Sequence, residues 1–186
     1  MNTTIDGKDM VTVYAQLKRK PRGLKKIASR CAFGCPQVVE THAFIEDAKP
    51  FPTLYWLTCP LKVKAVSRME DDGWAERLRE RIAVDSELRE RLECAQEDYK
   101  LRRRAGTGTD IDKDIDEETS VAGHPVFETG VGGVHNLNAV KCLHAHYAHY
   151  LADGNNPIGE LVEKELSGST GLECKEPCDR NENRRD

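Results

Sequence analysis

The chain of 186 residues has no long apolar run, and aromatic residues make up only 6% of it. A membrane-spanning helix needs roughly 18 or more consecutive apolar residues, and no segment approaches that length. The first residues also lack a basic stretch followed by an apolar stretch and a small-residue cleavage site. We therefore expect a cytoplasmic protein with no membrane contact.

The chain also lacks an excess of positive charge, because its formal net charge is -4. It therefore has no general attraction to nucleic acid, and such a contact would need a local basic patch. Residues 18–30 contain seven basic side chains and no acidic one, but also no aromatic side chain on which a base could stack. This favours a solvated loop and strand face, so nucleic acid is an unlikely partner and a protein partner is left open.

Hydrophobic residues make up 38% of the chain and charged residues 32%, so a core can form only where apolar residues are concentrated. The pattern predicts a flexible segment at 1–9 and a single α+β domain at 10–161. It also predicts an acidic linker at 105–120 inside the domain and a disordered tail at 162–186.

Runs rich in β-branched and aromatic residues predict strands at 10–17, 37–43 and 53–58, which we expect to form a small antiparallel sheet of about three strands. We expect about four helices to cover it. They are predicted at 61–69, at 74–83, from Asp85 or Ser86 onward, and from a cap at Asn138 to about residue 152. The third carries one apolar stripe, formed by Leu88, Leu92, Ala95 and Tyr99.

Cysteine and histidine are the residues most suggestive of chemistry. Cys142 and His146 lie four residues apart on the last predicted helix, so their side chains can reach a common ion. Cys31, Cys35 and Cys59 lie in predicted turns. Our hypothesis is that Cys31, Cys59 and Cys142 converge, and that Cys35 or His146 completes a site for zinc or for an iron–sulfur cluster. His135, His144 and His149 would line this site.

Two alternatives to a metal site stay open. Buried thiols also behave as small hydrophobic side chains, and histidines are favoured near the carboxyl end of a helix. A regulatory disulfide is the other alternative. A bound ion could take part in a reaction, or it could hold together a non-catalytic structural or regulatory binding module. The sequence therefore leaves enzymatic activity undecided.

A glycine-rich segment precedes the last predicted helix. Gly130, Gly132 and Gly133 could present backbone amides to an anion at the start of that helix. The segment matches neither the dinucleotide fingerprint nor the phosphate loop, so a plain connector is the favoured interpretation.

Four motifs together resemble the bacterial family known as domain of unknown function 501. They are the segments 30–36, 51–60, 129–133 and 141–150, followed by Asn156-Pro157-Ile158-Gly159. The resemblance runs from about residue 21 to 161 and implies a cytoplasmic bacterial protein with no established activity. Its members are often encoded near a septum formation initiator, an exopolyphosphatase and enolase. The motif positions that carry over are Cys31, Cys59, Cys142, His144, His146 and His149, whereas Cys35 is not among them.

Overall fold

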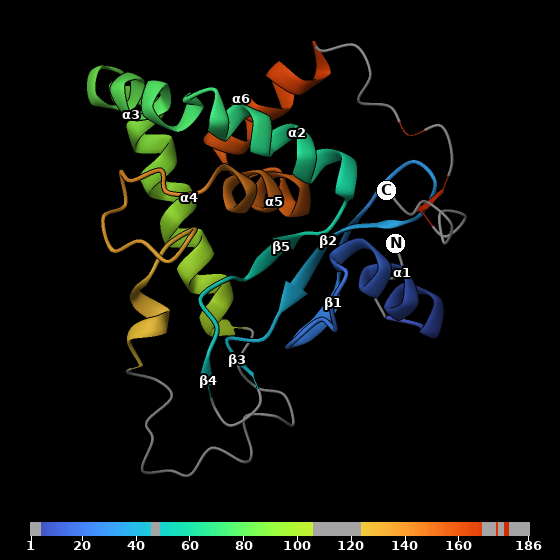
Figure 1. The fold of residues 1–186 in the computed structure, drawn as a ribbon. Helices are drawn as coiled ribbons and strands as arrows, with labels where there is room; N and C mark the ends of the chain where they lie inside the picture. The colour runs from blue at the N-terminus through green and yellow to red at the C-terminus, as the bar shows by residue number, and fades with distance from the viewer. Residues whose placement is uncertain (1–4, 46–48, 106–123, 169–173, 175–176, 179–186) are drawn as a thin grey trace.

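Strand β2 (Pro36–Thr41) is the centre of a three-stranded antiparallel sheet in the order β1-β2-β5 (Figure 1). Its neighbours are β1 (Leu24–Arg30) and β5 (Tyr55–Leu57). The structure, a computed structural model, describes residues 5–45, 49–105, 124–168, 174 and 177–178. All six residues of β2 are buried, because both faces of the sheet are covered.

Alternating side chains of β2 point to two different cores. Val38 joins the main hydrophobic cluster, which the sheet shares with most of the helices. Val39 instead packs with Val13 and Ile27 beneath helix α1 (Gly7–Leu17) on the opposite face. This alternation is the period of two that a strand imposes, and it explains why an apolar pair stands at the middle of β2.

Five further helices complete the fold in the part of the chain that the structure describes. They are α2 (Pro60–Asp71), α3 (Trp74–Val84), α4 (Ser86–Ala105), α5 (Leu143–Asp153) and α6 (Pro157–Ser167). Helix α5 lies against the sheet and packs with α2 and α6 (Figure 1). A short 3-10 helix, η4 (Pro125–Glu128), packs against α4. A two-stranded sheet of β3 (Phe44–Ile45) and β4 (Lys49–Pro50) lies near the end of α4 (Figure 1).

The predicted α+β class and small antiparallel sheet are confirmed. The expected strands at 37–43 and 53–58 correspond to β2 and β5, and the expected helices at 61–69 and 74–83 correspond to α2 and α3. The predicted stripe of α4 is also confirmed, because its four apolar side chains are all buried. No helix of the described segments is both long and apolar enough to cross a membrane.

The predicted strand at 10–17 is wrong, because this segment belongs to α1. The side chain of Asp6 accepts a hydrogen bond from the amide of Asp9, and the carboxylate of Asp9 accepts one from the amide of Asp6. This reciprocal cap starts a helix, and it outweighs the β-branched residues that suggested a strand.

The carboxyl-terminal helices also differ from expectation. Helix α5 begins at Leu143 and not after Asn138. Pro157 is the first residue of α6, where a proline has no amide to leave unpaired. Asn156 caps this helix by accepting the amide of Gly159 at 2.9 Å. The predicted disorder is therefore wrong for residues 162–167. Most of the acidic linker, at 106–120, lies outside the described residues.

Candidate functional site

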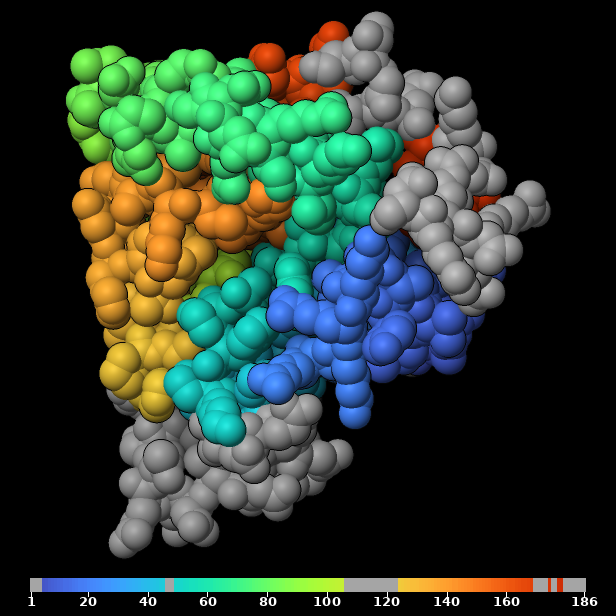
Figure 2. Space-filling view, in the orientation of Figure 1, coloured from blue at the N-terminus to red at the C-terminus, as the bar shows by residue number. Residues whose placement is uncertain are grey.

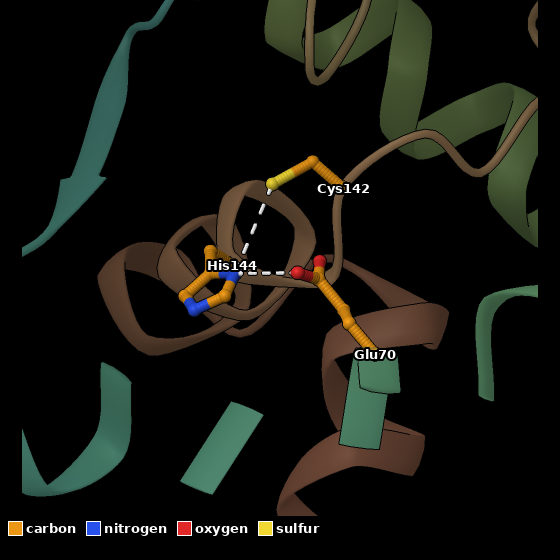
Figure 3. Close-up of side chains that lie close together, drawn as sticks. All are labelled: Glu70, Cys142 and His144. Atoms are coloured by element: carbon orange, nitrogen blue, oxygen red, sulfur yellow. Dashed lines mark hydrogen bonds and ion pairs between the residues drawn. The ribbon is translucent and has the colours of Figure 1, made fainter. Parts of the chain in front are cut away.

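The last turn of α2 meets the first turn of α5, and three different donor side chains face one another there (Figure 3). His144 Nδ1 lies 3.2 Å from Glu70 Oε2 and 4.0 Å from Cys142 Sγ. One ligand atom from each side chain lies within 4.8 Å of the other two. All three residues are half-buried. In the space-filling view, the part of the chain that contains α5 (orange) reaches the surface beneath α2 and α3 (green) (Figure 2).

Cys142 occupies the amino-terminal cap position of α5, with extended backbone. Its side chain makes no capping hydrogen bond, so the free amides of the first turn need another acceptor. Glu70 supplies it, because its Oε1 accepts the amide of Leu143 at 2.6 Å. A carboxylate is favoured at this positive end of a helix. Arg79 fixes the preceding chain by donating to the carbonyl of Val140 at 3.1 Å.

The ring of His144 is oriented by α2. Its Nε2 lies 3.2 Å from the carbonyl oxygen of Val63 and 3.3 Å from Ser67 Oγ. Since a carbonyl can only accept, Nε2 carries a hydrogen, and the lone pair of a neutral ring is left on Nδ1. The contact with the backbone therefore points Nδ1 at Glu70 and Cys142.

The pKa of His144 is raised to about 9. Burial acts first and would lower this pKa, but the hydrogen bond with Cys142 and the negative charge of Glu70 outweigh it. At neutral pH, without another cation, the ring therefore holds a proton on Nδ1. The negative charge of Glu70 stabilises this proton, and the same charge would stabilise a positive ion in its place.

The geometry separates two kinds of chemistry. In a nucleophilic cysteine site, the imidazole contacts the nucleophile through one nitrogen and its orienting group through the other. Here Glu70 and Cys142 both lie against Nδ1, while Nε2 contacts the backbone. Convergence of thiol, imidazole and carboxylate on one point is instead compatible with a metal ion, for which the carbonyl would orient the histidine from behind.

His146 and His149 lie elsewhere, fully buried between α5 and its neighbours. Asn156 Nδ2 lies 3.1 Å from Nδ1 of each ring. His146 is therefore part of a hydrogen-bonded core, and it belongs to neither of the close donor groups in the described residues. The i, i+4 spacing from Cys142, which is the cap residue before the helix, does not place the two side chains in one close donor group.

The second close donor group consists of Asp98, His149 and Asp153. Arg102 lies between its carboxylates, with Nε 2.6 Å from Asp98 and 3.3 Å from Asp153. The ring of His149 stacks on Tyr55 with centroids 5.6 Å apart. Because a guanidinium already balances the negative charge, we interpret this group as a structural ion-pair network.

The other predicted thiols lie around the β1–β2 turn and the start of α2. The amide of Cys31 donates to the carbonyl of Cys35 at 2.9 Å, and Cys59 is the cap residue of α2. Burial first, and then the charges of neighbouring thiols, raise the pKa of Cys174. The described thiols other than Cys94 and Cys142 are those of Cys31, Cys35, Cys59, Cys174 and Cys178. No three of them lie within 4.8 Å of one another in the described structure.

The glycine-rich segment forms a tight turn against α4. The amide of Gly130 donates to the carbonyl of Val134 at 2.7 Å, and the amide of Val131 donates to Gln96 Oε1 at 2.6 Å. A side chain added at Gly132 would contact Cys142, so the turn does adjoin the site. The turn does not lead directly into α5, and His135 is exposed.

Glu70 is the site residue that sequence reasoning missed. It stands in Met69-Glu70-Asp71-Asp72, where acidic side chains at the end of a short helix resemble a solvated face. A signal for it was the absence of a capping side chain at Cys142, which leaves the helix start in need of an acceptor from elsewhere.

Fold and site together define an α+β protein with a candidate metal centre between two helices. Residues 27–164 match the model of the family described as protein of unknown function (DUF501), and the chain belongs to that family. The resemblance inferred from the cysteine and histidine motifs is thereby confirmed. Comparison with curated proteins and with solved structures gave no match.

Proposed function

We propose that this protein binds a divalent metal ion, zinc, between Glu70, Cys142 and His144. The observation that carries the proposal is the convergence of Oε2, Sγ and Nδ1 within 4.8 Å, with His144 held from behind by the carbonyl of Val63. Thiolate, imidazole and carboxylate are the three side-chain ligands that zinc takes in proteins.

The donor set supports zinc over an iron–sulfur cluster at this place. Such clusters are held mainly by thiolates, and this group offers one. Three protein donors leave a fourth position for water or a substrate, which is the pattern of zinc sites that take part in reactions. The predicted joint cluster of Cys31, Cys59 and Cys142 is the rival proposal, and it would accept either cofactor.

An ion at this place would join α2 to the start of α5, so it should stabilise the fold as well as occupy the site. It would replace the proton that His144 otherwise holds. Metal binding should therefore release protons and should weaken as the pH falls.

The test is metal analysis of protein without an affinity tag, expressed with added zinc and purified without air. We expect about one zinc ion per chain from this group. Cys142→Ser and His144→Gln should each lose that ion, and zinc should no longer raise their melting temperature. Cys94→Ser, which removes an exposed thiol on α4, is the matched control and should keep the ion.

Two outcomes would contradict the proposal. One is wild-type protein that neither retains zinc nor melts higher in its presence. The other is loss of the ion in Cys31→Ser or Cys59→Ser while Glu70→Gln retains it, which would favour the rival thiol cluster. An absorption spectrum of the same samples separates zinc, which has no visible band, from an iron–sulfur cluster.

A further inference from the structure

A pocket of about 790 Å³ lies in the amino-terminal half of the fold, where the chain leaving α1 meets β3, β4 and β5. Its size falls within the range of pockets that hold small molecules, roughly 300 to 1,000 Å³. The residues that line it are Arg19, Lys20, Arg22, Ile45, Lys49, Phe51 and Trp56. None of them belongs to the candidate zinc site.

The backbone explains why cationic side chains gather here. Lys18 adopts a left-handed conformation that ends α1 and redirects the chain. Gly23 then passes so close to β3 that an added Cβ would lie 2.6 Å from Ile45 Cγ2. The segment between them therefore folds tightly along the wall of the pocket.

The charged residues described in the lining of the pocket are all basic. Four of the lining residues are basic, and the described residues contribute no acidic side chain to the lining. Lys20 and Arg22 are exposed, and neither forms an ion pair within the described segments. Like charges around a concave surface raise the local positive potential, which attracts and concentrates anions.

Two aromatic rings stand beside these cations. The ring centroids of Phe51 and Trp56 are 6.1 Å apart, and the guanidinium of Arg19 lies 4.6 Å from the Trp56 ring. The basic segment has no aromatic residue of its own, so the fold brings the rings from a part of the sequence about 30 residues further on. Aromatic rings next to basic side chains are a combination that binds a flat base and its phosphates together.

We propose that this pocket binds a nucleoside polyphosphate, with its phosphates at Lys20 and Arg22 and its base against Phe51 and Trp56. The phosphates supply a counter-charge that Lys20 and Arg22 do not receive from the described residues. The base adds stacking that an inorganic anion cannot provide. A pocket of bounded volume fits one nucleotide better than a continuous strand, which would need a groove that tracks its backbone.

Trp56 gives the experiment its own reporter. The chain has two tryptophans, and a Trp74→Phe background leaves only the one in the pocket. ATP is titrated while tryptophan fluorescence and, on the same samples, the heat of binding are followed. Inorganic triphosphate and adenosine are titrated separately, because the first keeps only the phosphates of ATP and the second keeps only its base and ribose.

We expect saturable binding of ATP, and binding at least about tenfold weaker for triphosphate and for adenosine. The affinity for ATP should fall as salt rises, since the contacts to phosphate are ionic. Lys20→Ala with Arg22→Ala should weaken ATP binding at least about tenfold. Lys64→Ala with Arg68→Ala removes the same charge from exposed positions on α2 and should leave it unchanged.

Three results would overturn the proposal. Absence of ATP binding by both readouts excludes a nucleotide. Equal affinity for triphosphate and ATP would make the pocket a general anion site. Binding of a single-stranded oligonucleotide far more tightly than ATP would make it a nucleic-acid contact. Loss of zinc in Cys142→Ser has no bearing on any of these, so the two proposals fail independently.

Discussion

Asn156 holds the two buried imidazoles of α5 in place. Its Nδ2 lies 3.1 Å from Nδ1 of both His146 and His149, and its Oδ1 lies 3.3 Å from Nδ1 of His146. Burial lowers the pKa of His146 to about 3 against the opposing hydrogen bond with Asn156, and the nearby His149 acts in the same direction as burial. His146 is therefore neutral in the folded protein.

This predicts a loss of stability in acid. The usual pKa of histidine is about 6.5, so between pH 6.5 and about 3 the unfolded chain binds a proton at this position and the folded chain does not. The contribution of His146 is fully present above pH 6.5 and falls by up to about 1.4 kcal/mol per pH unit as the pH drops through that window.

Urea unfolding at several pH values measures this loss of stability. The quantity compared between variants is the slope of the free energy of unfolding against pH. His146→Gln keeps a polar side chain but cannot titrate, so its free energy of unfolding should fall less steeply below pH 6.5 than that of the wild type. His135→Gln is the control for loss of an exposed imidazole. Parallel curves for the wild type and His146→Gln would show that His146 is not kept neutral by the fold.

At the same scale, the sequence indicates some site residues and misses others. Cys142 and His144 stand out because one cysteine and three of the six histidines of the chain lie between residues 142 and 149. Glu70 cannot be found that way, because its role depends on a contact between two helices that begin more than 80 residues apart. Tertiary approach, and not residue type, makes that carboxylate part of the site.

At the scale of elements, α5 and α6 pack at the closest approach that glycine permits. A Cβ at Gly159 would lie 2.4 Å from the carbonyl oxygen of His146 and 2.4 Å from Tyr150 Cβ. Neither of these atoms is the end of a flexible side chain. The two helices must therefore move apart to accommodate even a methyl group.

Gly159→Ala should destabilise the protein by about 1 to 3 kcal/mol, although alanine is the better helix former. Gly7→Ala is the matched control in α1, where an added Cβ has nothing within 4 Å. The control should be neutral or stabilising by up to about 1 kcal/mol, since it gains helix propensity alone. Both are measured by urea unfolding, and a Gly159→Ala variant at least as stable as the wild type would refute close packing at α6.

The elements also show where local signals suffice. Strands β2 and β5 follow from runs of apolar and β-branched residues, and the stripe of α4 follows from helical spacing. Helix α1 was missed because a reciprocal cap between Asp6 and Asp9 outweighs the strand-forming residues after it. The start of α5 was misplaced because its cap interaction comes from α2, which no local pattern reveals.

At the scale of the whole molecule, Arg103 connects three parts of the chain. It is 1% exposed, and its guanidinium donates to the carbonyls of Val126 at 2.6 Å and Thr129 at 2.8 Å. It also donates to the carbonyl of Pro52. It thereby joins α4 to the segment after the linker and to the chain that enters β5.

No carboxylate of the described residues pairs with Arg103. Its charge is balanced by carbonyl dipoles and by the face of Tyr99, whose ring centroid lies 4.8 Å from the guanidinium carbon. The planar fork of the guanidinium reaches carbonyls in two directions, which a single ammonium group cannot do. Shape as well as charge therefore matters at this position.

Arg103→Lys should consequently lower the free energy of unfolding by more than about 2 kcal/mol, even though the charge is kept, because buried carbonyls lose their donors. Arg103→Met should cost at least as much. The adjacent Arg104→Lys, exposed and paired with Glu128, should change it by less than about 0.5 kcal/mol. Urea unfolding of the three variants checks this order. If Arg103→Lys were as stable as the wild type, a point charge would suffice, and the fork could not be what joins these three segments.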